Sequence, residues 1–123
     1  MRATINWPLG TGDRLWTDPD GGARAETQIG GAMIRMDAGT GLAVLNLDDR
    51  IAQLQVTQGR LHVCVWRLEP DQVVEVHTPN LAFSLRLPGE YRIDVDPDAD
   101  ATTIFVSQGR GEAHGEDAAY VID

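Results

Sequence analysis

The sequence predicts an all-β fold, and three observations lead to that prediction. Apolar and polar residues alternate in short stretches along most of the chain, which is the pattern of half-buried strands. Thirteen glycines and six prolines separate these stretches, at intervals of roughly eight to twelve residues that are typical of all-β proteins. No window of about ten residues keeps apolar side chains at helical spacing without interruption by Gly, Pro or a β-branched cluster. We therefore expect roughly nine to twelve short strands in two facing sheets.

The clearest strand pattern runs from Thr78 to Asp96. Apolar residues alternate with small or polar ones on both sides of a Pro-Gly turn, namely Leu81, Phe83, Leu85 and Leu87 before Pro88-Gly89 and Tyr91, Ile93 and Val95 after it. This pattern predicts an antiparallel hairpin, because a slip of one residue would turn the apolar side chains into water.

The remaining strands are shorter and are separated by turn residues. Two pieces near the start, 5–7 and 14–17, are flanked by turns rich in Gly, Pro and Asp. Further strands are expected at 23–29, 32–36, 42–47, 51–56, 61–68, 73–77, 102–107 and 119–122. The nearly continuous apolar run 42–47 suits a strand buried on both faces or a short linking segment. A turn at 57–60 separates the strands 51–56 and 61–68.

An internal repeat indicates how the strands are arranged. Residues 53–60 align with residues 103–110 as apolar-x-apolar-(Thr/Ser)-Gln-Gly-Arg. Repeated strand-and-turn units at a fixed interval indicate stacked coils of sheet, as in a short solenoid. A chance similarity between two strands that end in the same type of turn is the alternative. We therefore expect a compact, solenoid-like stack of two sheets, with a jelly-roll or an ordinary β-sandwich as the alternative arrangement.

The alternation also predicts the core. The side chains expected to face inward are Ile29, Leu54, Val56, Leu61, Val63, Val65, Val74, Val76, Leu81, Phe83, Leu85, Tyr91, Ile93, Val95, Ile104 and Val106.

The composition limits the partners. At 123 residues, the chain is expected to form one domain, residues 1–123, taken from a longer protein. The net charge of −9 argues against binding to nucleic acid or anionic lipid, which reward clustered basic residues. No apolar run reaches the roughly 20 residues needed to cross a bilayer, and no signal segment is present, so we expect no membrane insertion. The single cysteine, Cys64, excludes an internal disulfide.

Motifs for catalysis or metal binding are incomplete. The aspartates at 94, 96, 98 and 100 alternate as calcium ligands can, but Gly and Glu are missing where a calcium loop needs them. Asp98 and Asp100 are better interpreted as turn residues around Pro97. His62 and Cys64 supply two zinc ligands where a site needs three or four. We expect no metal, no cofactor and no catalytic residues, so the chain is not expected to be an enzyme.

One strand has an unusual outer face. In the strand 61–68, the residues opposite the core are His62, Cys64 and Trp66, which are unusually apolar for a solvent face. We predict that they form an interaction surface. The alternative is that Trp7, Trp16 or Trp66 stacks on a small ligand or carbohydrate.

Several segments resemble the FecR domain in order and spacing. They are Gly12-Asp13-Arg14-Leu15-Trp16-Thr17, Arg24-Ala25-Glu26, Gln58-Gly59-Arg60-Leu61-His62-Val63 and Glu75-Val76-His77-Thr78-Pro79. The resemblance extends over about residues 9–113. That family usually continues with Arg-Gly-Thr after the Thr-Pro strand, whereas this chain has Leu87-Pro88-Gly89-Glu90-Tyr91, in which only Gly89 and Tyr91 fit.

The resemblance implies a function. The FecR domain is the extracytoplasmic, β-rich module of bacterial sensor and anti-sigma regulators and of other envelope proteins. It implies a periplasmic or extracytoplasmic domain that binds protein and has no catalytic residues or cofactor to carry over. We therefore expect a non-catalytic interaction and signalling module, with a small-ligand or carbohydrate-binding domain as the alternative. We expect a monomer, or a weak homodimer formed through an edge strand or through the face of His62, Cys64 and Trp66.

Overall fold

The computed structural model describes residues 2–4, 10–17, 24–29, 31–48, 50–115 and 119–122. Within these residues the secondary structure is all β, as predicted, and no helix that could cross a membrane is found among them. The strands are β1 (Arg2–Thr4), β2 (Arg14–Trp16), β3 (Arg24–Ile29), β4 (Ala32–Met36), β5 (Gly41–Leu47), β6 (Ile51–Val65), β7 (Val73–His77), β8 (Ala82–Leu85), β9 (Gly89–Asp96), β10 (Ala101–Gln108), β11 (Gly111–His114) and β12 (Ala119–Ile122).

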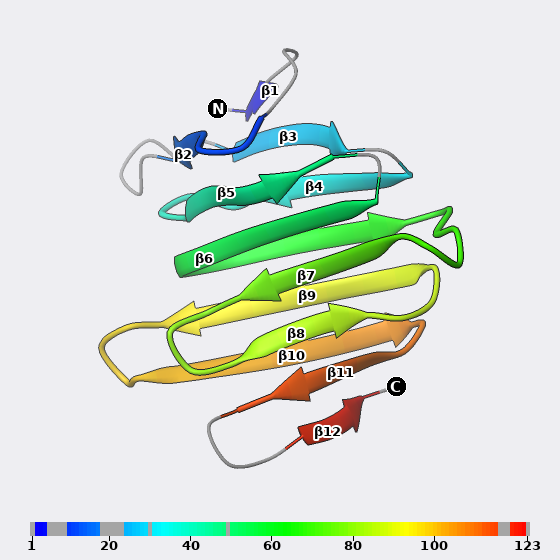
Figure 1. The fold of residues 1–123 in the computed structure, drawn as a ribbon. Helices are drawn as coiled ribbons and strands as arrows, with labels where there is room; N and C mark the ends of the chain where they lie inside the picture. The colour runs from blue at the N-terminus through cyan, green and yellow to red at the C-terminus, as the bar shows by residue number, and fades with distance from the viewer. Residues whose placement is uncertain are drawn as a thin grey trace.

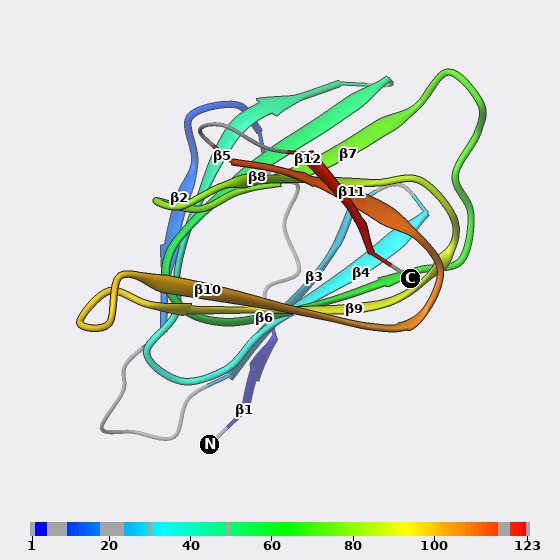
Figure 2. The same cartoon turned by 90° about the horizontal axis from the view of Figure 1, so that it is seen from below.

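The strands form two facing layers that share β6. The first sheet has the order β1-β3-β4-β6-β9-β10, and the second has the order β2-β5-β6-β7-β8-β11-β12. Figure 1 shows the strands stacked from β1 and β3 at one end to β11 and β12 at the other. Figure 2 looks along the stack and shows β9 and β10 in one layer and β8 and β11 in the other. Because each sheet keeps the chain order, the solenoid-like stack is confirmed and the jelly-roll alternative is wrong.

The prediction of two strands at 51–56 and 61–68 is wrong, because β6 is one continuous strand of 15 residues. Its first half pairs with β5 and β7 in the second sheet, and its second half pairs with β4 and β9 in the first. Gly59 lies where the strand changes sheets and has φ +97°. A Cβ atom there would lie 2.4 Å from Thr40 Oγ1. The glycine therefore bends the strand into the other layer without ending it.

The predicted hairpin at Thr78 to Asp96 is also wrong. β8 pairs with β7 and β11 in the second sheet, whereas β9 pairs with β6 and β10 in the first. The two strands face each other across the core, where the rings of Phe83 and Tyr91 meet edge to face with centroids 5.8 Å apart. Alternation correctly identified the inward side chains except that of Leu87, which follows β8 and is exposed. Facing strands and paired strands can both bury one side. The Pro-Gly turn is therefore a crossing between layers.

The core lies between the two sheets. Every residue predicted for the core is either buried or packed against the buried cluster. β4 and β5 add buried residues that were not predicted: Ala32, Ile34, Met36, Leu42 and Val44. β5 buries one face only, so its apolar run is neither a strand buried on both faces nor a linking segment. Among the described residues, Ala52 and Ala113 complete the set of buried hydrophobic side chains.

Hydroxyl groups fasten the points where the chain changes sheets. Thr40 Oγ1 donates to the carbonyl of Arg60 at 3.1 Å and accepts from the N–H of Arg60 at 3.0 Å. The Tyr91 hydroxyl lies 3.1 Å from the carbonyl of Arg110 and accepts from the N–H of Arg110 at 3.0 Å. Each arginine follows a glycine with positive φ, Gly59 or Gly109. The Gln-Gly-Arg repeat therefore marks two similar bends, each held by one hydroxyl.

Candidate interaction surface

A groove lies on the outer face of the first sheet, where four strands place one side chain each in a row. Strand register aligns Arg35 with His62, His62 with Arg92, and Arg92 with Phe105. The groove has a volume of about 540 Å³. Its lining also includes Met33, Glu26 and Cys64. We call this the outer groove.

The alternation of β6 places two of the predicted surface residues here. Leu61, Val63 and Val65 point into the core, so His62 and Cys64 point outward into the outer groove. Cys64 is exposed. Trp66 follows the last residue of β6 and is also exposed, but it is not among the residues that line the groove. The structure therefore brings His62 and Cys64 together and places Trp66 beyond them.

The charged side chains in and near the groove differ in whether they have hydrogen-bonding or ion-pair partners. His62 Nε2 lies 3.3 Å from Asp37 Oδ2. Arg60 Nε donates to Asp94 Oδ1 at 3.0 Å, and Arg92 Nε lies 3.3 Å from the same oxygen. Arg35, by contrast, has no hydrogen-bonding or ion-pair partner within the part of the chain that the structure describes. The groove therefore presents the Arg35 guanidinium without a hydrogen bond or ion pair to a described residue, although the carboxylates of Glu26 and Glu90 line the same groove.

An aromatic ring forms one side of the groove. The guanidinium carbon of Arg92 lies 3.8 Å from the centroid of the Phe105 ring, which is the distance of a cation–π contact. Phe105 is 44% exposed despite this contact. Aromatic side chains and arginine are enriched in protein–protein interfaces relative to the rest of the surface. Sequence reasoning missed Arg35, Arg92 and Phe105, because only the register of four strands places them beside His62.

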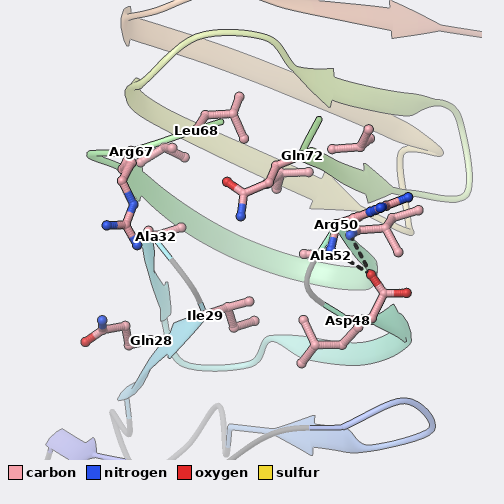
Figure 3. A pocket seen from close by; sticks show the side chains of 15 residues that line it. Gln28, Ile29, Ala32, Asp48, Arg50, Ala52, Arg67, Leu68 and Gln72 are labelled. Carbon is pink, nitrogen blue, oxygen red and sulfur yellow. Dashed lines mark hydrogen bonds between the residues drawn. The ribbon is translucent and has the colours of Figure 1, made fainter. Parts of the chain in front are cut away.

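A second hollow, the end cavity, opens between the two sheets at the strand ends that the β3–β4, β5–β6 and β6–β7 connections join. It has a volume of about 500 Å³. Its apolar lining includes half-buried Ile29, Leu47, Ile51, Leu68, Val73 and Val74. In Figure 3, Asp48 and Arg50 lie on one side of this end cavity and Arg67 and Gln28 on the other, with Gln72 between them.

Local hydrogen bonds organise the rim of the end cavity. The Asp48 carboxylate accepts from the N–H groups of Arg50 at 2.8 Å and Ile51 at 2.9 Å. These bonds hold the pKa of Asp48 below its ordinary value. The aspartate therefore fixes the turn into β6 and stays ionised at the rim.

The tryptophans do not converge on one site within the described residues. Trp7 lies outside those residues. Trp16 is 57% exposed on β2, where it packs over Gly41 of the second sheet beside Arg14 and Gln55. Trp66 is 51% exposed at the far end of β6. A stacking site that uses two of the described tryptophans is therefore ruled out by their placement.

The alternating aspartates form a turn. Asp96 Oδ1 accepts from the N–H groups of Asp98 at 3.0 Å and Ala99 at 3.2 Å. Asp98 and Asp100 are turn residues, as predicted, and the side chain of Asp96 holds the turn. Asp100 adopts φ +49° and accepts a hydrogen bond from Asn80 at 3.0 Å. Among the described residues, no three His, Cys, Asp or Glu side chains lie close enough together to hold a metal ion.

Comparison with known proteins identifies structural neighbours only. No family model matches the sequence, and no curated protein matches it. Two crystal structures of a putative anti-sigma factor from Parabacteroides distasonis share the fold, with TM-scores of 0.76 and 0.75. Each is 12% identical in sequence, and the alignment covers 89% of this chain and 50% of the neighbour. The chain therefore spans about half the length of these neighbours, and the likeness shows the fold alone.

Proposed function

We propose that this chain is a FecR-like, non-catalytic protein-interaction module of a bacterial envelope protein, and that it acts in signalling. The observation that carries this proposal is the position of the FecR-like segments. Gln58-Gly59-Arg60 forms the bend of β6, and Thr17 accepts the N–H of Thr40 at 2.9 Å beside that bend. Thr78 accepts the N–H groups of Asn80 at 3.2 Å and Leu81 at 3.1 Å before β8. The resemblance therefore rests on residues that hold the turns of this fold.

The shared fold supports a regulatory role. The neighbours are described as putative anti-sigma factors, and such regulators act by contacting other proteins. A periplasmic or extracytoplasmic location follows from the FecR resemblance and belongs to the same proposal. Fusion of the gene to a reporter that is active only outside the cytoplasm tests the location.

The outer groove is the part of the surface best suited to a protein partner. It combines the Arg35 guanidinium, the exposed ring of Phe105 and the exposed Cys64 on one open face. A partner that supplies an acidic group for Arg35 and an apolar group for Phe105 would fit this combination.

Cys64 allows a direct test because it is the only cysteine of the chain. A maleimide–benzophenone group attached to Cys64 places a photo-cross-linker in the outer groove. The control carries the cysteine on the other sheet, as Thr57→Cys in a Cys64→Ser background, because Thr57 is exposed on the second sheet. In the periplasmic fraction of the bacterium that encodes the chain, we expect one protein to cross-link to the first probe and not to the second. Equal products from both probes, or none, would contradict the proposal.

Binding of a small apolar ligand in the end cavity is a second candidate, favoured by its volume of about 500 Å³ and its largely apolar lining, both within the range of ligand pockets. The probe 8-anilinonaphthalene-1-sulfonate tests it by fluorescence. If this candidate is correct, the probe binds saturably, Leu68→Glu in the end cavity abolishes its binding, and Arg35→Glu in the outer groove leaves its binding unchanged. A probe signal that is absent or insensitive to Leu68→Glu would exclude it.

A further inference from the structure

We propose that β10 is the edge through which two copies of this chain pair, in antiparallel orientation, so that the first sheet continues from one copy into the other. Among the described residues, β10 pairs with β9 and with no other strand. One side of its backbone therefore presents N–H and C=O groups that no described strand satisfies. This inference does not rest on the function proposed above, although β10 contributes Phe105 to both surfaces.

The composition of β10 is unusual for an edge strand. Proteins protect edges by making them short, by placing charged residues or Pro on them, or by bulges. The other terminal strands follow this rule by length, since β1 and β2 have 3 residues each and β12 has 4. β10 has 8 residues, Ala-Thr-Thr-Ile-Phe-Val-Ser-Gln, with no charge and no proline. Only a register irregularity near its end interrupts it.

The core is open along the same edge. Ile104 and Val106 pack against the buried cluster but remain half-buried, because no strand lies beyond them in the first sheet. Phe105 points to the opposite face and is exposed. A further strand at this edge would cover apolar surface on both faces of the sheet while it pairs the free backbone groups.

Charge favours a second copy in antiparallel orientation. The chain carries a net charge of −9, so two copies meet with least repulsion along an uncharged segment. β10 is preceded by a turn containing Asp96, Asp98 and Asp100 and is followed by Arg110. Pairing about a twofold axis near Phe105 places the acidic turn of one copy near the Arg110 end of the other.

The same geometry keeps the two acidic turns apart. The 8 residues of β10 span about 26 Å, which exceeds the Debye length of roughly 8 Å at physiological ionic strength. Parallel pairing would instead bring the two acidic turns together. Because one short strand from each copy makes the contact, the buried area is small, and we expect a weak dimer that depends on concentration.

Sedimentation equilibrium of the complete chain tests the proposal from micromolar to millimolar concentration. For the unmodified chain, the mass should rise from 13.4 kDa toward that of a dimer, at low and at raised salt. Thr103→Glu adds a charge to the exposed edge, and Ser107→Glu does so at a second exposed position. Each should weaken the dimer by about tenfold or more, because an axis near residue 105 places position 103 opposite position 107 of the second copy, so that each variant adds two charges to the short edge that has to pair, and charged side chains on an edge strand oppose its pairing. Gln55→Glu, which adds the same charge to a central strand, should leave the dimer unchanged.

Cross-linking tests the orientation. Phe105→Cys in a Cys64→Ser background should form an intermolecular disulfide, because an axis near residue 105 brings the two cysteines within bonding distance. Gln55→Cys in the same background should not. A chain that stays monomeric at all concentrations overturns the proposal. A dimer that survives both edge variants but dissociates in Trp66→Glu also overturns it, because the contact then lies at the end of β6.

Discussion

Two hydroxyl groups perform the same task at different bends of this fold. Thr40 is fully buried, and its hydroxyl serves both backbone groups of Arg60. The Tyr91 hydroxyl accepts from the N–H of Arg110 at 3.0 Å and donates its one hydrogen to the carbonyl of Leu87 at 2.5 Å, while the carbonyl of Arg110 lies 3.1 Å away. These contacts provide hydrogen-bond partners for backbone groups at the points where the chain passes from one sheet to the other.

Removal of the Thr40 hydroxyl should therefore lower the free energy of unfolding by more than the small size of the group suggests. Thr40→Val keeps the shape but leaves the N–H of Arg60 without its partner, and we expect a loss of about 1–3 kcal/mol in the free energy of unfolding. Urea denaturation measures this loss. Thr57→Val, at an exposed position, is the matched control and should change stability by less than about 0.5 kcal/mol. Equal effects of the two substitutions would show that the Thr40 hydroxyl is not a fastening group.

Gly59 and Gly12 provide a matched pair for the bend of β6. Both have positive φ, +97° and +94°, but a Cβ at Gly59 would lie 2.4 Å from Thr40 Oγ1, whereas Gly12 has nothing within 4 Å. Gly12→Ala should cost about 1–2 kcal/mol of backbone strain. Gly59→Ala should cost at least about 2 kcal/mol more, because it adds a steric clash in a packed core. Thermal and urea unfolding would disprove this account if the two variants were equally stable.

The partly buried hydroxyl of Tyr91 should make the stability of the protein decrease at alkaline pH. Burial raises the pKa of Tyr91, and the hydrogen bonds with Arg110 and Leu87 oppose that rise. The unfolded chain thus loses this proton at a lower pH than the folded chain. The stabilisation that results from this pKa difference is fully present below the ordinary tyrosine pKa of about 10. It is lost as the pH rises through the pKa of Tyr91 in the folded chain. Unfolding measured between pH 8 and pH 11 should show a decline that is smaller in Tyr91→Phe. An identical decline in the variant would contradict the assignment.

At the scale of elements, alternation identifies which side chains face inward but not which strands pair. Leu81 to Leu87 and Tyr91 to Val95 alternate as strongly as a hairpin does, yet β8 and β9 belong to different sheets. A glycine in a strand pattern is similarly ambiguous, because Gly59 bends β6 without ending it. Pairing depends on contacts between distant residues, which no local pattern contains.

The outer groove shows the same limit. The alternation of β6 was enough to place His62 and Cys64 on the outer face. Arg35, Arg92 and Phe105 lie on three other strands, and only the observed register brings them into one row. The structure therefore places His62 and Cys64 where alternation put them, and their role in an interaction surface stays a prediction. The three residues on the other strands could not be found from the sequence.

Hydrogen exchange should distinguish the strands by their pairing. The second half of β6 lies between β4 and β9, so the amides of Leu61 and Val63 should exchange only through global unfolding. Amides of β10 that point away from β9 should exchange rapidly at low protein concentration and more slowly at high concentration if the edge pairs with a second copy. Slow exchange of all β10 amides at every concentration would mean that the edge is covered by another part of the same chain.

At the scale of the whole molecule, the two sheets have different outer faces. The second sheet carries a row of polar side chains, in which Asn46 donates to Gln53 at 2.6 Å and Gln53 donates to Glu75 at 3.4 Å. These groups satisfy one another. The first sheet carries the outer groove, in which Arg35 lacks a partner among the described residues and Phe105 is exposed. A protein partner is therefore expected on the first sheet.

The most direct test of this account is the affinity of the protein that cross-links to Cys64, measured by isothermal titration calorimetry against three forms of the complete chain. Arg35→Glu reverses the charge in the outer groove, and Arg14→Glu makes the same change at an exposed site on the second sheet. We expect Arg35→Glu to weaken binding by about tenfold or more, since it removes a charge-assisted contact and adds repulsion. Arg14→Glu should stay within about twofold of the unmodified chain. Equal weakening by both variants, or none by Arg35→Glu, would contradict a partner-binding role for the outer groove.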